Sequence, residues 1–243
     1  MRSNANLPLL YMLLNVSSAL RLRPSPFLPS RLVNVNSIRM SSSSKDYYSN
    51  IKSKWVDEYP SSDEIDETWA FYKECGYADP QATLRSMLEP IEFSKKRILD
   101  YGCDKGHMLE FFCAGLDGVE GHGVDINEEA VKFAKQRYSS YTFQAGDGMT
   151  IPYPEKHFDV VICIATIKHV RHEDRKAVYS ELNRVAKYVL MIEADETEEK
   201  KQEFRGWTFY NSNFGKEFAA NFGKPVKVVR EAGDILGMYE CKK

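Results

Sequence analysis

The sequence lacks a long apolar run, a paired-cysteine pattern and a strong excess of charge of either sign. No segment has the roughly 18 consecutive apolar residues that a membrane-spanning helix needs. The five cysteines are an odd number without a Cys-x-x-Cys spacing, which indicates reduced thiols rather than a disulfide scaffold or a zinc cluster. A net charge of −2 argues against a chain built as a whole to coat nucleic acid. What is present, 43% hydrophobic and 28% charged residues over 243 positions, is typical of one globular domain with room for a tail.

Residues 1–45 differ from the rest because they contain no Asp or Glu, but five Arg, one Lys and ten Ser. This composition is typical of an organelle transit peptide, so we expect a mitochondrial or plastid location, with the cytoplasm as the alternative. Two other interpretations stay open. The apolar run Leu7 to Val16 before Ser17-Ser18-Ala19 is also typical of a secretory signal, and Met40 can be the working start after an untranslated or disordered leader.

The remaining chain carries a net charge of −8 and changes its pattern near residue 96. Residues 46–95 are helical and aromatic in pattern and predict an N-terminal helical cap. In residues 96–243, short apolar runs alternate with helical segments, which is typical of βαβ units and a parallel sheet. The last two expected strands have only 232–237 between them, too few residues for a crossover helix, so they should pair antiparallel. The predicted fold class is α/β, a Rossmann-like three-layer sandwich with a mostly parallel sheet and an antiparallel final hairpin. The expected strands are 97–101, 119–126, 141–145, 158–165, 188–193, 226–231 and 238–241, and the expected helices are 106–114, 127–138, 174–185 and 213–221.

Three acidic residues come at the ends of three consecutive predicted strands. Asp100 ends the strand in ILDYGCDKGH, where Gly102 and Gly106 flank a turn that opens a helix. Asp125 follows in GHGVDIN, and Asp147 in AGDGM. Ligands in open α/β sheets bind at the carboxyl ends of the strands, where such acids meet. An acid at the second position accepts ribose hydroxyls, and a carboxylate at the third accepts the amine of adenine.

Each acid also has an ordinary structural interpretation. Asp125 can be a helix N-cap, although Asn127 is available for that role. Asp147 can be a turn residue between Gly146 and Gly148. The combination of three such acids in order is what favours a nucleoside site over three unrelated turns.

Four segments together extend this pattern. ILDYGCDKGH, GVDIN, GDGMTIPYPEKHFDVV and ICIATIKHV resemble motifs I, post-I, II and post-II of the class I S-adenosylmethionine-dependent methyltransferases, closest to the methyltransferase type 11 group. The resemblance covers about residues 97–193. It implies a seven-stranded sheet with an antiparallel final hairpin, S-adenosylmethionine as the cofactor, and methyl transfer by in-line displacement.

The resemblance also implies which residues hold the cofactor. Asp100, Gly102 and Gly106 would line its methionine side, Asp125 would hold the ribose, and Asp147 would face the adenine. The full set of implied cofactor-binding residues is Asp100, Gly102, Cys103, Gly106, Asp125, Ile126, Asp147, Gly148 and Met149.

The sequence departs from the family at two places. Asp104 stands at the middle glycine of the usual Gly-x-Gly-x-Gly turn, which puts cofactor affinity in question more than the fold. The Pro-Gly-Gly turn usual before the fifth strand is replaced by residues 184–188, which run directly into that strand.

Candidates for the acceptor side are fewer. His169 follows the fourth strand and is the candidate general base, with a structural histidine as the alternative. We expect the aromatic-rich segment 204–214 to form a lid or pocket wall, and Trp55, Trp69 and Tyr72 to cover the site or fill the core. Residues 194–203 are expected to form a solvated helix face. No His, Cys and Asp spacing predicts a metal site.

These observations favour a methyltransferase with a small-molecule acceptor. Two alternatives stay open: an RNA methyltransferase, because ATIKHV also resembles tRNA wobble-uridine methyltransferases, and a non-catalytic S-adenosylmethionine-binding module in which Asp104 spoils the turn. The acidic body and the absence of an appended RNA-binding domain disfavour a nucleic-acid partner. The oligomeric state is not set by the sequence.

Overall fold

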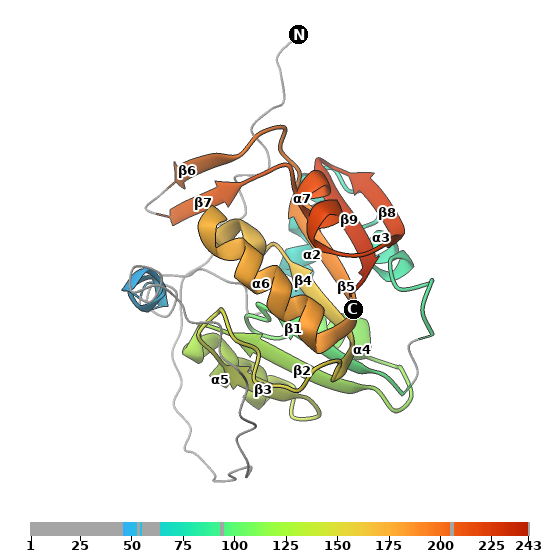
Figure 1. Ribbon diagram of the computed structural model, residues 1–243. Coiled ribbons are helices and arrows are strands. Elements are labelled where there is room, and N and C mark those ends of the chain that lie inside the picture. Colours follow the sequence, from blue (N-terminus) through green and yellow to red (C-terminus); the bar gives the residue numbers. More distant parts are fainter. Residues whose placement is uncertain (1–45, 53, 55–63, 93–94, 205–206, 243) are drawn as a thin grey trace.

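The computed structural model describes residues 46–52, 54, 64–92, 95–204 and 207–242. Its centre is a seven-stranded sheet in the order β3-β2-β1-β4-β5-β9-β8 (Figure 1). The strands are β1 (Arg97–Tyr101), β2 (Glu120–Asp125), β3 (Thr142–Ala145), β4 (Phe158–Ile164), β5 (Ala186–Ala194), β8 (Pro225–Glu231) and β9 (Asp234–Glu240). β1 to β5 are parallel, and β9 pairs antiparallel with both β5 and β8, which confirms the predicted sheet and hairpin.

The sheet is covered by helices on both faces, because its central strands are apolar on both sides. Alternate residues of β4 and β5 enter two separate clusters of buried side chains. One cluster packs against α2 (Ile65–Glu74), α3 (Pro80–Ser86), α4 (His107–Cys113) and α5 (Glu128–Arg137). The other packs against α6 (His172–Val185) and α7 (Phe214–Asn221). These two helical layers and the sheet form the three-layer sandwich.

The predicted helix face at residues 194–203 is wrong. Lys200–Phe204 is a strand, β6, which pairs antiparallel with β7 (Trp207–Asn211) in a separate two-stranded sheet (Figure 1). β7 contains Trp207, Phe209 and Tyr210, which favour extended backbone. The polar β6 takes the same conformation through its hydrogen bonds with this neighbouring strand, and the charge pattern of the sequence does not reveal that pairing.

Two connections place the functional residues. β1 lies between β2 and β4, so the strand order reverses beside it, and the ends of β1, β2 and β4 face one crevice. α6 ends at Val185 and β5 begins at Ala186, so the absent Pro-Gly-Gly turn leaves the sheet intact. The final hairpin is tighter than predicted, because only Ala232 and Gly233 separate β8 from β9, both with positive φ. Among the described residues, the helices are too short or too polar to cross a bilayer.

Candidate functional site

A cavity of about 470 Å³ opens at the carboxyl ends of β1, β2 and β4. A cavity of this size is in the range that holds a small molecule or cofactor. It brings together seven of the ten residues predicted for the site, one from the acceptor side and six from the cofactor side. These are Asp100, Gly102, Cys103, Asp125, Ile126, Gly148 and His169.

The turn after β1 has the backbone shape that the glycine motif requires. Gly102 has φ +81°, and a Cβ there would lie 2.6 Å from Thr166 Cγ2, so both conformation and space demand glycine. Asp104 has φ +45°, in the left-handed region that a glycine would normally occupy. The departure from the family motif therefore changes the side chain while the backbone conformation is kept.

Asp125 holds this turn from the neighbouring strand. Its Oδ2 accepts a hydrogen bond from the Asp104 amide at 2.8 Å, and its Oδ1 accepts one from the Asn127 amide at 2.7 Å. The helix N-cap is Asn127, whose side chain accepts hydrogen bonds from the amides of Glu129 and Ala130. Burial raises the pKa of Asp125, and the two amide donors oppose that rise. Asp125 thus lies in the cavity wall rather than capping α5.

Asp100 is the most deeply buried acid of the site, with 2% of its surface exposed. Its Oδ2 has no hydrogen-bond partner among the described residues. Burial raises the pKa of Asp100 to about 8, and the nearby carboxylates of Asp125 and Asp104 add to that rise. A buried acid with an unused oxygen at a cavity wall is typical of a ligand-binding position.

Three predicted cofactor residues do not line the cavity in this structure: Gly106, Asp147 and Met149. Gly106 is the N-cap of α4 and packs close to Phe143, so its role is in the turn. Asp147 Oδ1 accepts hydrogen bonds from the amides of Met149 and Thr150, at 2.8 and 2.7 Å. Since that oxygen closes its own turn, Asp147 shapes the loop that presents Gly148 and Thr150 to the cavity.

A second part of the cavity wall, here named the acceptor end, comes from the turn η2 (Ile167–His169) and from β7. The His169 ring lies 5.2 Å from the Phe209 ring. Burial, and then the charge of Lys168, lower the pKa of His169 well below its usual range, so its imidazole is neutral. Beneath the turn, Glu193 Oε1 accepts a hydrogen bond of 2.5 Å from the Ile167 amide. A neutral imidazole here is able to accept a proton.

Several lining residues were not found from the sequence because they come from distant elements. Tyr48 and Ile51 reach the cavity from residues 46–52, Thr68 from α2, and Gln202 from β6. Phe209 and Asn211 also line it, from the segment 204–214 that was expected to form a lid or pocket wall. Of the expected aromatic residues, Tyr72 lines the cavity, whereas Trp69 is in the core, with its ring 4.6 Å from that of Phe111. Trp55 lies outside the described residues.

The residues present fit S-adenosylmethionine. Three acidic side chains at one end, Asp100, Asp104 and Asp125, suit a ligand with a positive sulfur, an amino group and a ribose diol. The unused oxygen of Asp100 offers an acceptor for such a donor. Within the described ranges, no group of His, Cys, Asp and Glu is arranged to hold a metal ion.

Comparison with known proteins agrees with this geometry. Residues 98–188 match a family described as a methyltransferase domain. The chain is 31% identical over 101 residues to ajmaline N-methyltransferase of Rauvolfia serpentina, and 29% identical over 69 residues to fatty-acid O-methyltransferase of Mycolicibacterium smegmatis. These matches cover 39% and 28% of this chain. A crystal structure of an S-adenosylmethionine-dependent methyltransferase from Aquifex aeolicus has the same fold, with a TM-score of 0.52 and 18% identity over 66% of this chain and 89% of that one.

Residues 98–188 thus match a methyltransferase domain, and S-adenosylmethionine is the cofactor that this match and the shared fold imply. The matches span 34% and 25% of the two curated relatives. The family match ends within β5, so the β6–β7 hairpin, α7 and the final two strands lie outside it.

Proposed function

We propose that this chain moves a methyl group from S-adenosylmethionine to a small-molecule acceptor by in-line displacement. The observation that supports this most strongly is one cavity whose wall holds three acids, Asp100, Asp104 and Asp125, together with the half-buried His169. The bound cofactor supplies a methyl group on a positively charged sulfur, which is already activated for displacement.

The protein's part is to bind the cofactor and the acceptor, to align them with each other and to exclude water from between them. Asp125 and the turn at Gly102 and Asp104 would bind the ribose and methionine parts. Asp147, through its turn, would place Gly148 beside the adenine. Alignment of two reactants in this way is able to supply about 7–11 kcal/mol of the barrier. The elements that close the cavity over the acceptor are residues 46–52 and the β6–β7 hairpin.

His169 would accept the proton that the acceptor loses. A general base contributes about 10²–10⁴-fold to a rate, so His169→Gln should lower methyl transfer within that range. S-adenosylhomocysteine binding should stay near that of the parent, because His169 is not among the acids of the cofactor end. Unchanged transfer in His169→Gln would remove His169 from the proposal without affecting the cofactor assignment.

A small acceptor is supported by the size of the cavity and by the relatives. The named relatives act on an alkaloid nitrogen and on a fatty-acid oxygen, so the acceptor atom differs even among similar chains. The acceptor end here mixes Phe209 with Lys168, Gln202 and Asn211. This lining suits a small acceptor that has both a ring or chain and polar groups.

The test is methyl transfer from radiolabelled S-adenosylmethionine by the full chain, with a metabolite extract and total RNA as separate acceptors. Label in a small organic product supports the proposal. Label in RNA, with transfer falling steeply as salt rises, would replace it with the RNA alternative. Cofactor binding without transfer to either would leave a non-catalytic binding module.

We also propose that residues 1–45, which lie outside the described residues, direct the chain to a mitochondrion or plastid. A fusion of this segment to a fluorescent protein should colocalise with one of these organelles. Diffuse cytoplasmic fluorescence, or secretion, would contradict this.

A further inference from the structure

Arg175, in the first turns of α6, is a buried arginine with 2% of its surface exposed. Its Nη1 donates to Glu217 Oε2 of α7 at 2.9 Å, and its Nε donates to the Val170 carbonyl at 3.1 Å. Its Nη2 donates to the Tyr210 carbonyl. One guanidinium thereby joins three separate segments of the chain.

Two of these segments, the one that contains Val170 and strand β7, form the acceptor end of the cavity. Val170 is the residue after His169, and it lines the cavity itself. Tyr210 lies in β7 between Phe209 and Asn211, both of which line the cavity. The two carbonyls that Arg175 binds therefore belong to the two walls between which an acceptor would lie.

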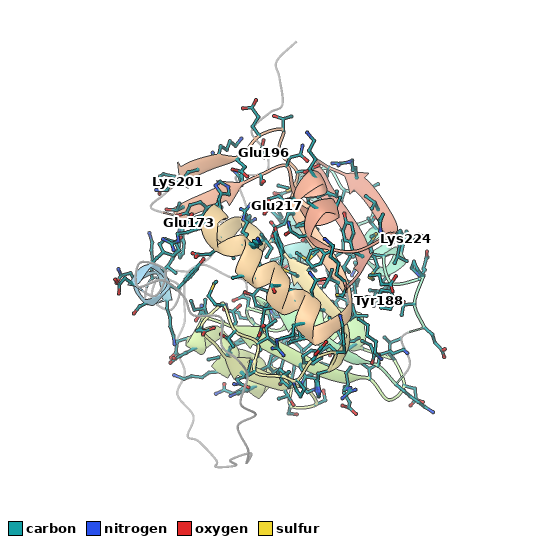
Figure 2. The ribbon with its side chains drawn as sticks, in the orientation of Figure 1. Glu173, Tyr188, Glu196, Lys201, Glu217 and Lys224 are labelled. Carbon is teal, nitrogen blue, oxygen red and sulfur yellow. The ribbon has the colours of Figure 1, made fainter. Side chains whose placement is uncertain are left out.

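The third partner keeps the arginine in place. Glu217 projects from α7 toward α6 (Figure 2), where its second oxygen accepts a hydrogen bond of 2.9 Å from the Tyr179 hydroxyl. The Arg175 guanidinium also lies 4.7 Å from the centre of the Phe214 ring. A buried ion pair of this kind adds little stability over apolar packing of the same volume, but it fixes the geometry of its partners.

We propose that Arg175 is a positioning residue for the acceptor end: it holds the His169 turn and β7 at a fixed separation. The role of Arg175 in positioning an acceptor rests on the proposed function, whereas the titration of His169 tests the inference without an acceptor. It predicts that a change at Arg175 alters the surroundings of His169 and the acceptor, while the cofactor end of the cavity stays unchanged.

The same helix offers a matched control. Arg184 also pairs with a carboxylate, Glu181, and donates to two carbonyls, those of Tyr153 and Ile151, at 2.8 and 2.9 Å. Those carbonyls lie in the segment between β3 and β4 rather than at the acceptor end. Arg175→Lys and Arg184→Lys each replace a guanidinium that makes several hydrogen bonds with an ammonium, and both keep the charge. They differ mainly in whether the lost hydrogen bonds hold the acceptor end or the segment between β3 and β4.

The first readout needs no acceptor. Lys168 on the same turn is the charge that acts on His169, and Glu193 of β5 lies beneath that turn. Glu196 and Lys200 line the same cavity. The proton NMR signal of the His169 ring is identified by its loss in His169→Gln. In the parent this ring should titrate well below its ordinary range. In Arg175→Lys the loosened walls should expose more of the ring to water, and its pKa should move up toward the ordinary value of about 6.5.

The second readout is transfer to the metabolite extract. In Arg175→Lys the amount of extract that gives half-maximal transfer should rise by about tenfold, because small misplacements of reacting groups have large effects. Binding of S-adenosylhomocysteine should stay within about twofold of the parent, because Arg175 makes none of its hydrogen bonds to the acids at the cofactor end. Arg184→Lys should leave the His169 titration and the extract dependence unchanged.

An unchanged His169 titration in folded Arg175→Lys, or an equal change in Arg184→Lys, would overturn the inference. If Arg175→Lys does not fold, His172→Ala takes its place, since His172 Nε2 lies 3.0 Å from the Asn211 carbonyl and ties the same wall. His172→Ala should shift the His169 titration in the same direction, and no shift would overturn the inference. If the parent transfers no label at all, the proposed function fails, and the titration still decides the role of Arg175.

Discussion

The carboxylate of Asp125 accepts a hydrogen bond of 2.8 Å from the backbone amide of Asp104. This bond joins the end of β2 to the turn that follows β1. It also supports a non-glycine residue at φ +45°, a conformation that aspartate and asparagine tolerate better than most side chains. The acid expected to bind ribose is therefore also the acid that sets the shape of the neighbouring turn.

Gly102 should not accept a side chain. Gly102→Ala places a Cβ at φ +81° and 2.6 Å from Thr166 Cγ2. We expect a loss of about 2 kcal/mol or more in the free energy of unfolding, measured with urea. Adding Thr166→Ala removes the contact with Cγ2 but not the strain in φ, so the double variant should recover only part of the loss. Full recovery would contradict the left-handed conformation at Gly102.

Asp147 should act through its turn. Asp147→Ala removes the acceptor for the amides of Met149 and Thr150, so the loop that carries Gly148 should loosen and S-adenosylhomocysteine should bind more weakly. Asp147→Asn keeps an oxygen for both amides and should bind nearly like the parent. Calorimetric titration distinguishes the two variants. Equal losses in Asp147→Ala and Asp147→Asn would instead indicate a direct, charge-dependent contact with the cofactor.

Asp100 should make the unliganded protein less stable as pH rises. Its pKa is about 8 in the folded protein and about 3.9 in an unfolded chain. Between these values the folded state holds the proton more tightly, so the contribution of Asp100 to stability is complete below about pH 4 and is lost as pH rises through about 8. Asp100→Asn cannot ionise. Its melting temperature relative to the parent should therefore increase from pH 5 to pH 8, and a constant difference would contradict the raised pKa.

The sheet could be predicted from the sequence because its information is local. VVICIA in β4 is apolar on both faces, and the acids at the strand ends follow such runs directly. Parallel strands then bring Asp100 and Asp125 to one edge without further assumptions, and both line the cavity.

The parts that could not be predicted depend on how elements pair and pack against one another. β6 is polar and takes its conformation from pairing with β7, for example where Thr208 donates to Glu203 at 2.9 Å. In the sequence, Arg175 looks like an ordinary surface charge on an amphipathic helix. Its burial and its partners are set by the packing of α7 and β7 against α6. Asp147 is correctly placed in the sequence, but the choice between its own turn and a ligand is made by side-chain geometry.

Calorimetric titration of the full chain with S-adenosylhomocysteine, beside Asp125→Ala, tests the central claim most directly. We expect binding of one ligand per chain in the parent. In Asp125→Ala we expect an affinity lower by about tenfold or more, because the variant loses a buried acceptor and the support of the Asp104 turn. Circular dichroism of the variant is the control for its fold. No heat with the parent, or equal affinity in a folded Asp125→Ala, would contradict the assignment of this cavity as the cofactor site.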